Sequence, residues 1–222
     1  MARSFTNLFF KAAKKIGKLQ RAAMRMAVPK AAKKRAAPKR NAAKSATASA
    51  TRGAAAGQSL GVGRWEASRQ FSDSQGRRLT YARYTPVTPS REGMPLVVML
   101  HGCRQGALAF ARGSRMNQWA DAGGFMVLYP QQSMTRQVQR CWRWFQPDAQ
   151  HGGGEADLIA ALIRAEVARH GLDPQRVYIA GLSAGAGMAA LVALRHPALV
   201  AALAMHSGPV VGDARNAAAG LH

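Results

Sequence analysis

One serine in this sequence has neighbours that suit nucleophilic chemistry. The segment Gly181-Leu182-Ser183-Ala184-Gly185 follows the apolar run 177–180 and precedes a stretch of small residues. The G-x-S-x-G spacing is typical of a sharp turn from a buried strand into a helix, which exposes the serine hydroxyl above the helix N-terminus. The pattern therefore indicates Ser183 as a candidate nucleophile. The alternative is that Ser183 only caps a helix of small residues.

A second short motif lies where an oxyanion donor is expected. His101-Gly102-Cys103 ends the apolar run 96–100, which reads as an earlier buried strand. The backbone N–H groups of Cys103 and Ala184 are predicted to converge on a developing oxyanion beside Ser183. The alternative is that Gly102 merely lets the chain turn.

Three motifs in this order resemble one family of esterases. Leu100-His101-Gly102-Cys103, Cys141-Trp142-Arg143-Trp144-Phe145 and Gly181–Gly185 resemble the poly(3-hydroxybutyrate) depolymerase family, which is similar to feruloyl and acetyl xylan esterases. The resemblance runs from about Trp65 to Gly208. It implies an α/β-hydrolase fold, Ser183 as nucleophile, and hydrolysis of carboxylic esters. The motifs do not specify the substrate, for which short-chain hydroxyalkanoate polymers or oligomers are the leading hypothesis. It implies no metal or organic cofactor.

The same resemblance couples the two cysteine motifs. It implies a disulfide between Cys103 and Cys141 that ties the donor loop to the aromatic loop; the alternative is two unrelated buried thiols. An oxidised pair favours an extracellular or periplasmic location. The N-terminus fits a secretory signal poorly, because lysines interrupt the short apolar stretch 5–10, so a cytoplasmic location stays open.

The aromatic loop has two interpretations. Trp142, Trp144 and Phe145 precede the long amphipathic segment 155–170. They are predicted either to line an apolar acyl pocket near Ser183 or to pack over the edge of the sheet.

The sequence also departs from the family pattern. Gly185-Ala186-Gly187 replaces the usual Gly-Gly pair, and Arg104 stands where a small polar residue is common. The family's triad acid and base follow the serine on later strands, so we expect both beyond His222 and interpret the chain as the N-terminal two-thirds of an esterase. The candidates after Ser183 are Asp213, His196, His206 and His222, of which His206 is expected nearest to the serine.

The elements that must position these residues follow an α/β order. Short apolar runs bounded by Gly or Pro predict buried strands, and amphipathic or small-residue segments between them predict helices. The result is a mostly parallel sheet with helices on both faces. The predicted strands are two within 64–86 and one each at 96–100, 125–130, 177–180 and 199–205, and the predicted helices are 114–122, 155–170 and 184–194.

The charge is concentrated before this domain. The chain has 222 residues and a net charge of +22, and residues 1–60 hold fifteen Lys and Arg and no acid. We interpret 1–63 as a basic tail and linker with an amphipathic helix at 5–27, and 64–222 as the esterase domain. Residues 1–44 are expected to bind an anionic surface, such as a polyester granule, a membrane or nucleic acid without specific readout. A catalytically inert surface-binding protein is the alternative function.

Overall fold

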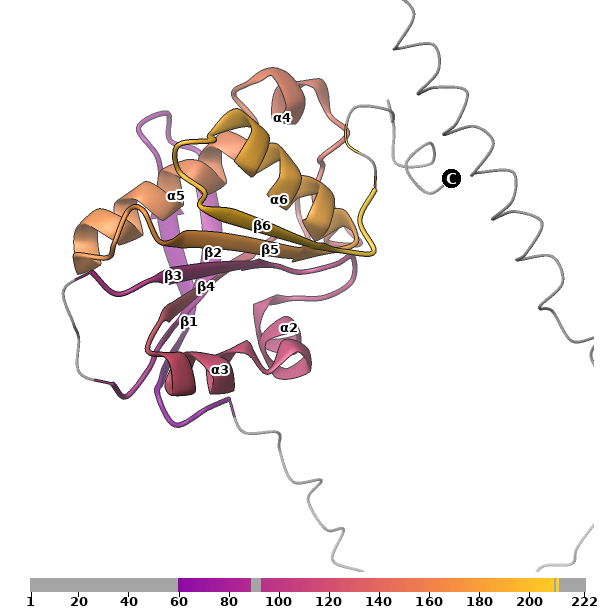
Figure 1. The fold of residues 1–222 in the computed structure, drawn as a ribbon. Helices are drawn as coiled ribbons and strands as arrows, with labels where there is room; N and C mark the ends of the chain where they lie inside the picture. Colours follow the sequence, from indigo (N-terminus) through magenta and orange to yellow (C-terminus); the bar gives the residue numbers. More distant parts are fainter. Residues whose placement is uncertain (1–59, 89–92, 210, 212–222) are drawn as a thin grey trace, which may run out of the picture. The chain divides into compact units, whose positions relative to one another are not determined.

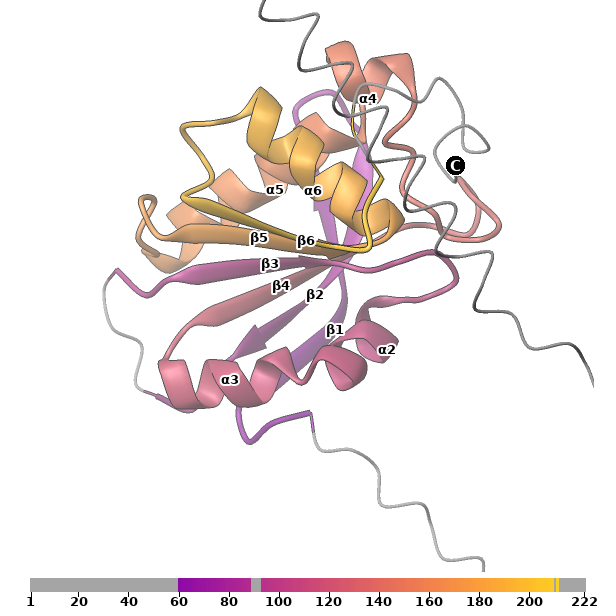
Figure 2. The ribbon, with the colours of Figure 1, turned by 45° about the vertical axis from the view of Figure 1, so that its right-hand side comes forward.

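The computed structural model describes residues 60–88, 93–209 and 211. The predicted basic tail and its helix at 5–27 lie outside these residues. The described part contains a six-stranded sheet with helices on both of its faces (Figures 1 and 2). Within it, no helix is both long enough and apolar enough to cross a membrane.

The elements alternate as the sequence predicts for an α/β protein. Two strands come first and are followed by strands and helices in turn. Their bounds are β1 Arg64–Ser72, β2 Arg78–Thr85, β3 Leu96–Leu100, α2 Ala107–Ser114, α3 Met116–Gly123, β4 Met126–Gln131, α4 Pro147–His151, α5 Glu155–His170, β5 Val177–Leu182, α6 Ala184–Arg195 and β6 Ala202–His206.

The sheet is antiparallel at one side and parallel over the rest. The strand order is β1-β2-β4-β3-β5-β6, in which β1 pairs with β2 and β2 with β4 in antiparallel fashion. Strands β4, β3, β5 and β6 are parallel neighbours. The carboxyl ends of these parallel strands therefore meet along one edge, where ligands bind in open α/β sheets.

The central strands are buried on both faces, which explains their unbroken apolar sequence. In β3, Leu96 and Leu100 belong to a hydrophobic cluster with α5 and α6, whereas Met99 belongs to the cluster with α2 and α3. In β4, Leu128 belongs to the cluster with α5 and α6, and Val127 belongs to the cluster with α2 and α3. Side chains alternate across a strand, so each run of apolar residues supplies two cores at once.

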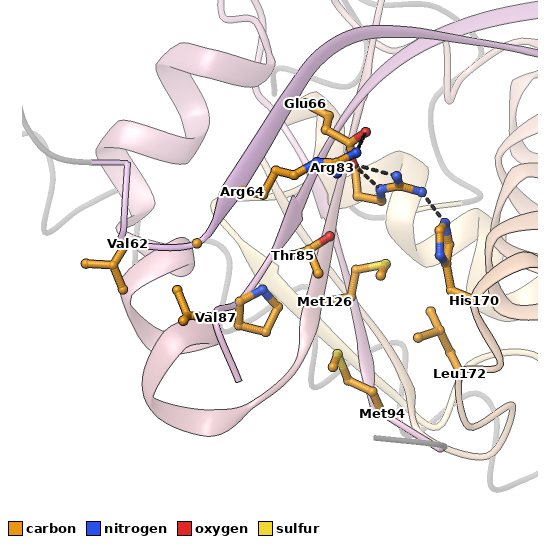
Figure 3. Close-up of a pocket in the computed structure, with 12 residues that line it drawn as sticks. Val62, Arg64, Glu66, Arg83, Thr85, Val87, Met94, Met126, His170 and Leu172 are labelled. Atoms are coloured by element: carbon orange, nitrogen blue, oxygen red, sulfur yellow. Dashed lines mark hydrogen bonds and ion pairs between the residues drawn. The ribbon is translucent and has the colours of Figure 1, made fainter. Parts of the chain in front are cut away.

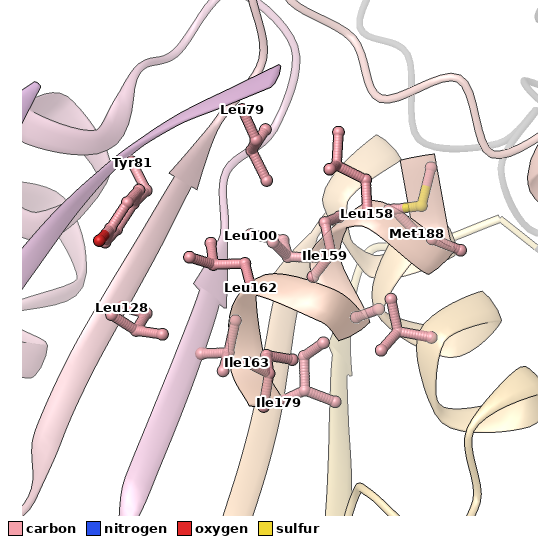
Figure 4. Packing of buried hydrophobic residues seen from close by; sticks show 14 of the residues in the cluster. Leu79, Tyr81, Leu100, Leu128, Leu158, Ile159, Leu162, Ile163, Ile179 and Met188 are labelled. Carbon is pink, nitrogen blue, oxygen red and sulfur yellow. The ribbon is translucent and has the colours of Figure 1, made fainter. Parts of the chain in front are cut away.

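Helix α5 supplies much of the larger core (Figure 4). Leu158, Ile159, Leu162 and Ile163 are each at most 2% exposed and pack against the sheet. The helix ends at Gly171, whose φ of 57° gives the left-handed C-cap that its sequence predicts. The predicted bounds of 155–170 are confirmed.

One prediction about local structure was right except at its start, and another was wrong. The helix predicted at 114–122 is α3, Met116–Gly123, which begins later because Arg115, with a left-handed φ of 55°, separates it from α2. The run 199–205 was expected to be a buried strand, but β6 spans Ala202–His206 and all five of its residues are exposed. Strand β6 is the outermost strand of the described sheet, so no described strand covers its far edge.

Candidate active site

Ser183 forms the whole connection between β5 and α6. Strand β5 ends at Leu182, and α6 begins at Ala184. The backbone of Ser183 has φ 54° and ψ −121°, a conformation that costs a non-glycine residue about 1–3 kcal/mol. Its side chain makes no capping hydrogen bond to the helix. The capping alternative therefore does not describe this serine, whose hydroxyl is bonded to no residue that the structure describes.

The two flanking glycines allow this sharp turn. A Cβ at Gly181 would collide with the carbonyl group of Gly185. A Cβ at Gly185 would collide with the carbonyl oxygens of Leu100 and His101 at the end of β3. Backbone atoms cannot give way as a flexible side chain can, so the G-x-S-x-G spacing is required for the close approach of β3, β5 and α6.

Two backbone N–H groups at this site have no partner among the described residues. The N–H of Ala184 and the N–H of Cys103 donate to no residue that the structure describes. Ala184 is the first residue of α6, whose N-terminus favours negative charge. The Ser183 N–H differs, since it donates to the His206 carbonyl oxygen at 2.9 Å and so fixes the turn to β6.

A disulfide joins Cys103 to Cys141, with 4.2 Å between the Cα atoms. It ties the loop after β3 to the aromatic loop, which is the pairing that the family resemblance implied. The backbone at Arg104, just after the first cysteine, is further held by a hydrogen bond from its N–H to the Gln139 carbonyl oxygen at 2.5 Å.

The predicted site residues line a single cavity of about 270 Å³. Trp142 is 1% exposed and Trp144 5% exposed, so both also belong to the core, and Phe145 packs edge-on against Trp144. The aromatic loop thus lies between the core and this cavity, and its role as an acyl pocket stays a prediction. The lining residues are Cys103, Cys141, Trp142, Trp144, Phe145, Ser183, Ala184, Ser207, Gly208 and Pro209.

The described residues supply no base to the serine. His206 is exposed, and its Nδ1 lies 3.0 Å from the Ser207 hydroxyl rather than against Ser183. His196 follows the last residue of α6, about 20 Å along the helix from Ser183, and lies 2.9 Å from an Asp157 oxygen. The other two candidates, Asp213 and His222, lie outside the described residues. Among the described residues, no cluster of His, Cys, Asp and Glu is suited to a metal ion.

A polar network supports the donor loop, and the sequence did not indicate it. The buried Gln132 follows β4, and its backbone N–H donates to His101 Nε2 at 3.1 Å. Its side-chain amide donates to Glu155 at 2.6 Å, and the other Glu155 oxygen accepts from the Arg143 N–H at 2.9 Å. Glu155 thus joins α5 to the aromatic loop. The position of Gln132 at a strand's carboxyl end was the one available signal.

A larger cavity, of about 520 Å³, lies at the opposite edge of the sheet (Figure 3). Its wall contains Arg83, which is 5% exposed and bonds to Glu66 at 2.5 Å and to Glu166 at 2.9 Å. His170 also contacts the Arg83 guanidinium. Because the arginine is already paired on several sides, this network holds β1 and β2 to α5 and leaves little capacity for a ligand.

Burial and neighbouring charges shift the pKa values of Glu66 and His170 in this network. Burial raises the pKa of Glu66, but hydrogen bonds from Arg64 and Arg83 outweigh it and lower that pKa to about 2. Burial lowers the pKa of His170, and the Arg83 charge lowers it further. Glu66 is thus ionised in the folded protein across the usual pH range.

Comparison with known proteins gives a consistent result. Residues 79–222 match a family model described as esterase PHB depolymerase. The chain is 41% identical over 118 residues to poly(3-hydroxyalkanoate) depolymerase C of Paucimonas lemoignei, covering 51% of this chain and 28% of that protein. It is 34% identical over 146 residues to feruloyl esterase B of Neurospora crassa, covering 64% and 49%. The chain thus spans less than half the length of these two relatives.

A solved structure supports the fold. The acetyl xylan esterase from Aspergillus awamori superimposes with a TM-score of 0.59 at 24% identity, covering 69% of this chain and 56% of that one. Identity at this level carries the fold alone, and it supports the mostly parallel sheet with helices on both faces.

Proposed function

This chain belongs to the PHB depolymerase family of esterases, and we propose that it hydrolyses carboxylic esters with Ser183 as the nucleophile. The observation that carries the proposal is the cavity at the carboxyl ends of the parallel strands. It brings together a serine on a strained turn, the residues Cys103 and Ala184, whose N–H groups donate to no described residue, and an aromatic wall.

In the proposed reaction, Ser183 Oγ attacks the ester carbonyl carbon and loses its proton to a base. The carbonyl oxygen becomes an oxyanion, which the N–H groups of Cys103 and Ala184 stabilise. The tetrahedral species collapses, the alcohol leaves with a proton, and an acyl-serine remains. Water then attacks the acyl-serine, releasing the carboxylic acid and restoring the hydroxyl. We expect the base and its acid partner outside the described residues.

The size and lining of the cavity favour a short acyl group. Its volume of about 270 Å³ falls just below the usual range for ligand pockets, and Trp144 and Phe145 make part of the wall apolar. A relative at 41% identity is named a poly(3-hydroxyalkanoate) depolymerase. We therefore propose short-chain hydroxyalkanoate polymers or oligomers as substrates. The Cys103–Cys141 disulfide supports an extracellular or periplasmic location.

Substrate assays test this proposal directly. The purified chain is incubated with linear 3-hydroxybutyrate trimers, methyl ferulate and p-nitrophenyl butyrate, and acid release is measured beside Ser183→Ala and Ser207→Ala. Since the base and its acid partner are expected beyond His222, we expect release by this chain to be slow. Release from the trimer should exceed that from methyl ferulate, vanish in Ser183→Ala, and persist in Ser207→Ala, because Ser207 lines the same cavity but is not on the nucleophile turn. Equal release by Ser183→Ala would refute the proposal.

The basic segment favours a second role in surface binding. Residues 1–60 carry fifteen positive side chains and no acid. Contact with an anionic surface would release counterions, so binding should weaken steeply with salt. We expect the full chain to sediment with anionic vesicles at low salt and a chain that starts at Gly61 not to sediment. Equal sedimentation of both would refute this role.

A further inference from the structure

The peptide unit between Gly102 and Cys103 is held from its carbonyl side. His101 Nδ1 lies 2.8 Å from the Gly102 carbonyl oxygen. The N–H of the same peptide unit belongs to Cys103 and is one of the two N–H groups proposed to bind the oxyanion. In a trans peptide the C=O and N–H point in opposite directions, and the described residues contain no cis peptide bond. A bond that fixes the carbonyl therefore also fixes the direction of the Cys103 N–H.

The partners of His101 determine which ring nitrogen carries the proton. The backbone N–H of Gln132 points at His101 Nε2 across 3.1 Å. A backbone N–H can only donate, so Nε2 must be the unprotonated nitrogen. The proton of a neutral ring is then on Nδ1, which donates to the Gly102 carbonyl oxygen.

The surroundings keep this ring neutral and in place. His101 is fully buried and packs against Trp142 with ring centroids 5.3 Å apart, and the Trp142 indole N–H donates to the His101 carbonyl oxygen at 3.1 Å. Burial lowers the pKa of His101; the hydrogen bond to Gly102 opposes this shift, and the nearby Arg140 charge adds to it. A neutral imidazole is the form that the two hydrogen bonds require.

We propose that His101 is a positioning residue, whose Nδ1–H holds the Gly102–Cys103 peptide so that the Cys103 N–H faces the oxyanion formed at Ser183. The inference rests on the proposed function. Glycine tolerates backbone rotations that other residues resist, so the peptide after Gly102 needs the hydrogen bond from His101 to hold its orientation. If it turned over, it would present a carbonyl oxygen to the oxyanion in place of a donor. A hydrogen bond to the Gly102 carbonyl also polarises the peptide and strengthens its N–H as a donor.

Three substitutions separate this role from packing. His101→Asn keeps an amide nitrogen at the position of Nδ1, His101→Gln places its amide at the level of Nε2, and His101→Phe keeps only the ring. The labelling of Ser183 by a fluorophosphonate is followed against inhibitor concentration, which separates the maximal rate from the inhibitor's affinity.

We expect the maximal labelling rate to fall about 10- to 100-fold in His101→Phe and His101→Gln, with little change in affinity, since outright loss of one oxyanion donor costs about 10²- to 10³-fold. His101→Asn should retain most of the rate. An unchanged maximal rate in folded His101→Phe would overturn the inference. If His101→Phe does not fold, equal rates in His101→Asn and His101→Gln overturn it instead, because the two differ in which nitrogen they replace.

A measurement on the unmodified chain is independent of activity. The nitrogen spectrum of chain labelled with ¹⁵N-histidine reports the tautomer of each ring. We expect a proton on His101 Nδ1 and none on Nε2; the opposite tautomer overturns the inference. Failure of Ser183 to label at all contradicts the proposed function, and the spectrum still decides whether His101 holds the Gly102 carbonyl.

Discussion

The Cα of Gly187 faces the indole ring of Trp144, and a Cβ added there would lie 2.9 Å from Trp144 Cγ. The same Cβ would lie 2.8 Å from Pro209 Cγ, on another wall of the candidate cavity. Gly187 therefore lets α6 pass directly under the aromatic loop. This contact accounts for the second glycine of Gly185-Ala186-Gly187, the segment that departs from the Gly-Gly pair usual in the family.

Substituting Gly187 by alanine should destabilise the protein although alanine favours helices. Gly113 in α2 is the matched control, because a Cβ there meets nothing within 4 Å. Gly113→Ala should raise the free energy of unfolding by up to about 1 kcal/mol. Gly187→Ala should lower it by about 1–3 kcal/mol through overpacking against Trp144. Urea unfolding of both variants tests this. A higher free energy of unfolding in both would show that the Trp144 ring does not limit the space for a Cβ at position 187.

The disulfide should contribute strongly to stability. Cys103 and Cys141 are 38 residues apart, for which loop-closure entropy predicts about 4 kcal/mol. The double variant Cys103→Ser/Cys141→Ser should lower the free energy of unfolding by up to this amount. It should also slow ester hydrolysis, because Cys103 belongs to the donor loop. Unfolding and activity are measured with and without dithiothreitol, and a stability unaffected by reduction would contradict the prediction.

Glu66 should make stability fall in acid. Its pKa is lowered from 4.5 in the free group to about 2 in the fold, so the stabilisation from its bonds is full above pH 4.5. That stabilisation should be lost as the pH falls from 4.5 toward 2. Glu66→Gln should flatten the decline over this window. Asp148→Asn, at an exposed acid with no ion pair to a described residue, serves as the comparison variant. Identical pH profiles for Glu66→Gln and the unmodified chain would contradict the assignment.

The central strands and the long helix could be predicted from the sequence because each has a clear pattern of apolar residues: an unbroken run in a strand buried on both faces, and one apolar face in the helix. The run Leu96–Leu100 and the amphipathic segment Glu155–His170 were predicted correctly for this reason. Helix α4 was missed because its five residues are too few to show a period. Helix α2 was missed because Ala107–Ser114 contains few large apolar residues. The exposure of β6 depends on which strand ends the sheet, which is a property of the whole fold.

In the candidate site too, the residues within local motifs could be predicted and those joined by long-range contacts could not. Ser183, Cys103 and the aromatic loop were found because motifs with fixed spacing mark them. His101, Gln132 and Glu155 were not assigned a supporting role, since their hydrogen bonds join segments far apart in the chain. The burial of Glu166 on an otherwise apolar helix face likewise depends on Arg83, 83 residues away in sequence. Pairings of this kind have no local pattern.

Labelling with a fluorophosphonate followed by peptide mass spectrometry tests the role of Ser183 most directly. The reagent forms an adduct with a reactive serine. Since the base is expected beyond His222, the full chain should label slowly and carry one adduct, on the peptide that contains Ser183. The adduct should be absent from Ser183→Ala and present in Ser207→Ala, which removes a neighbouring hydroxyl of the same cavity. An adduct on another residue, or equal labelling of Ser183→Ala, would contradict the assignment of Ser183 as the nucleophile.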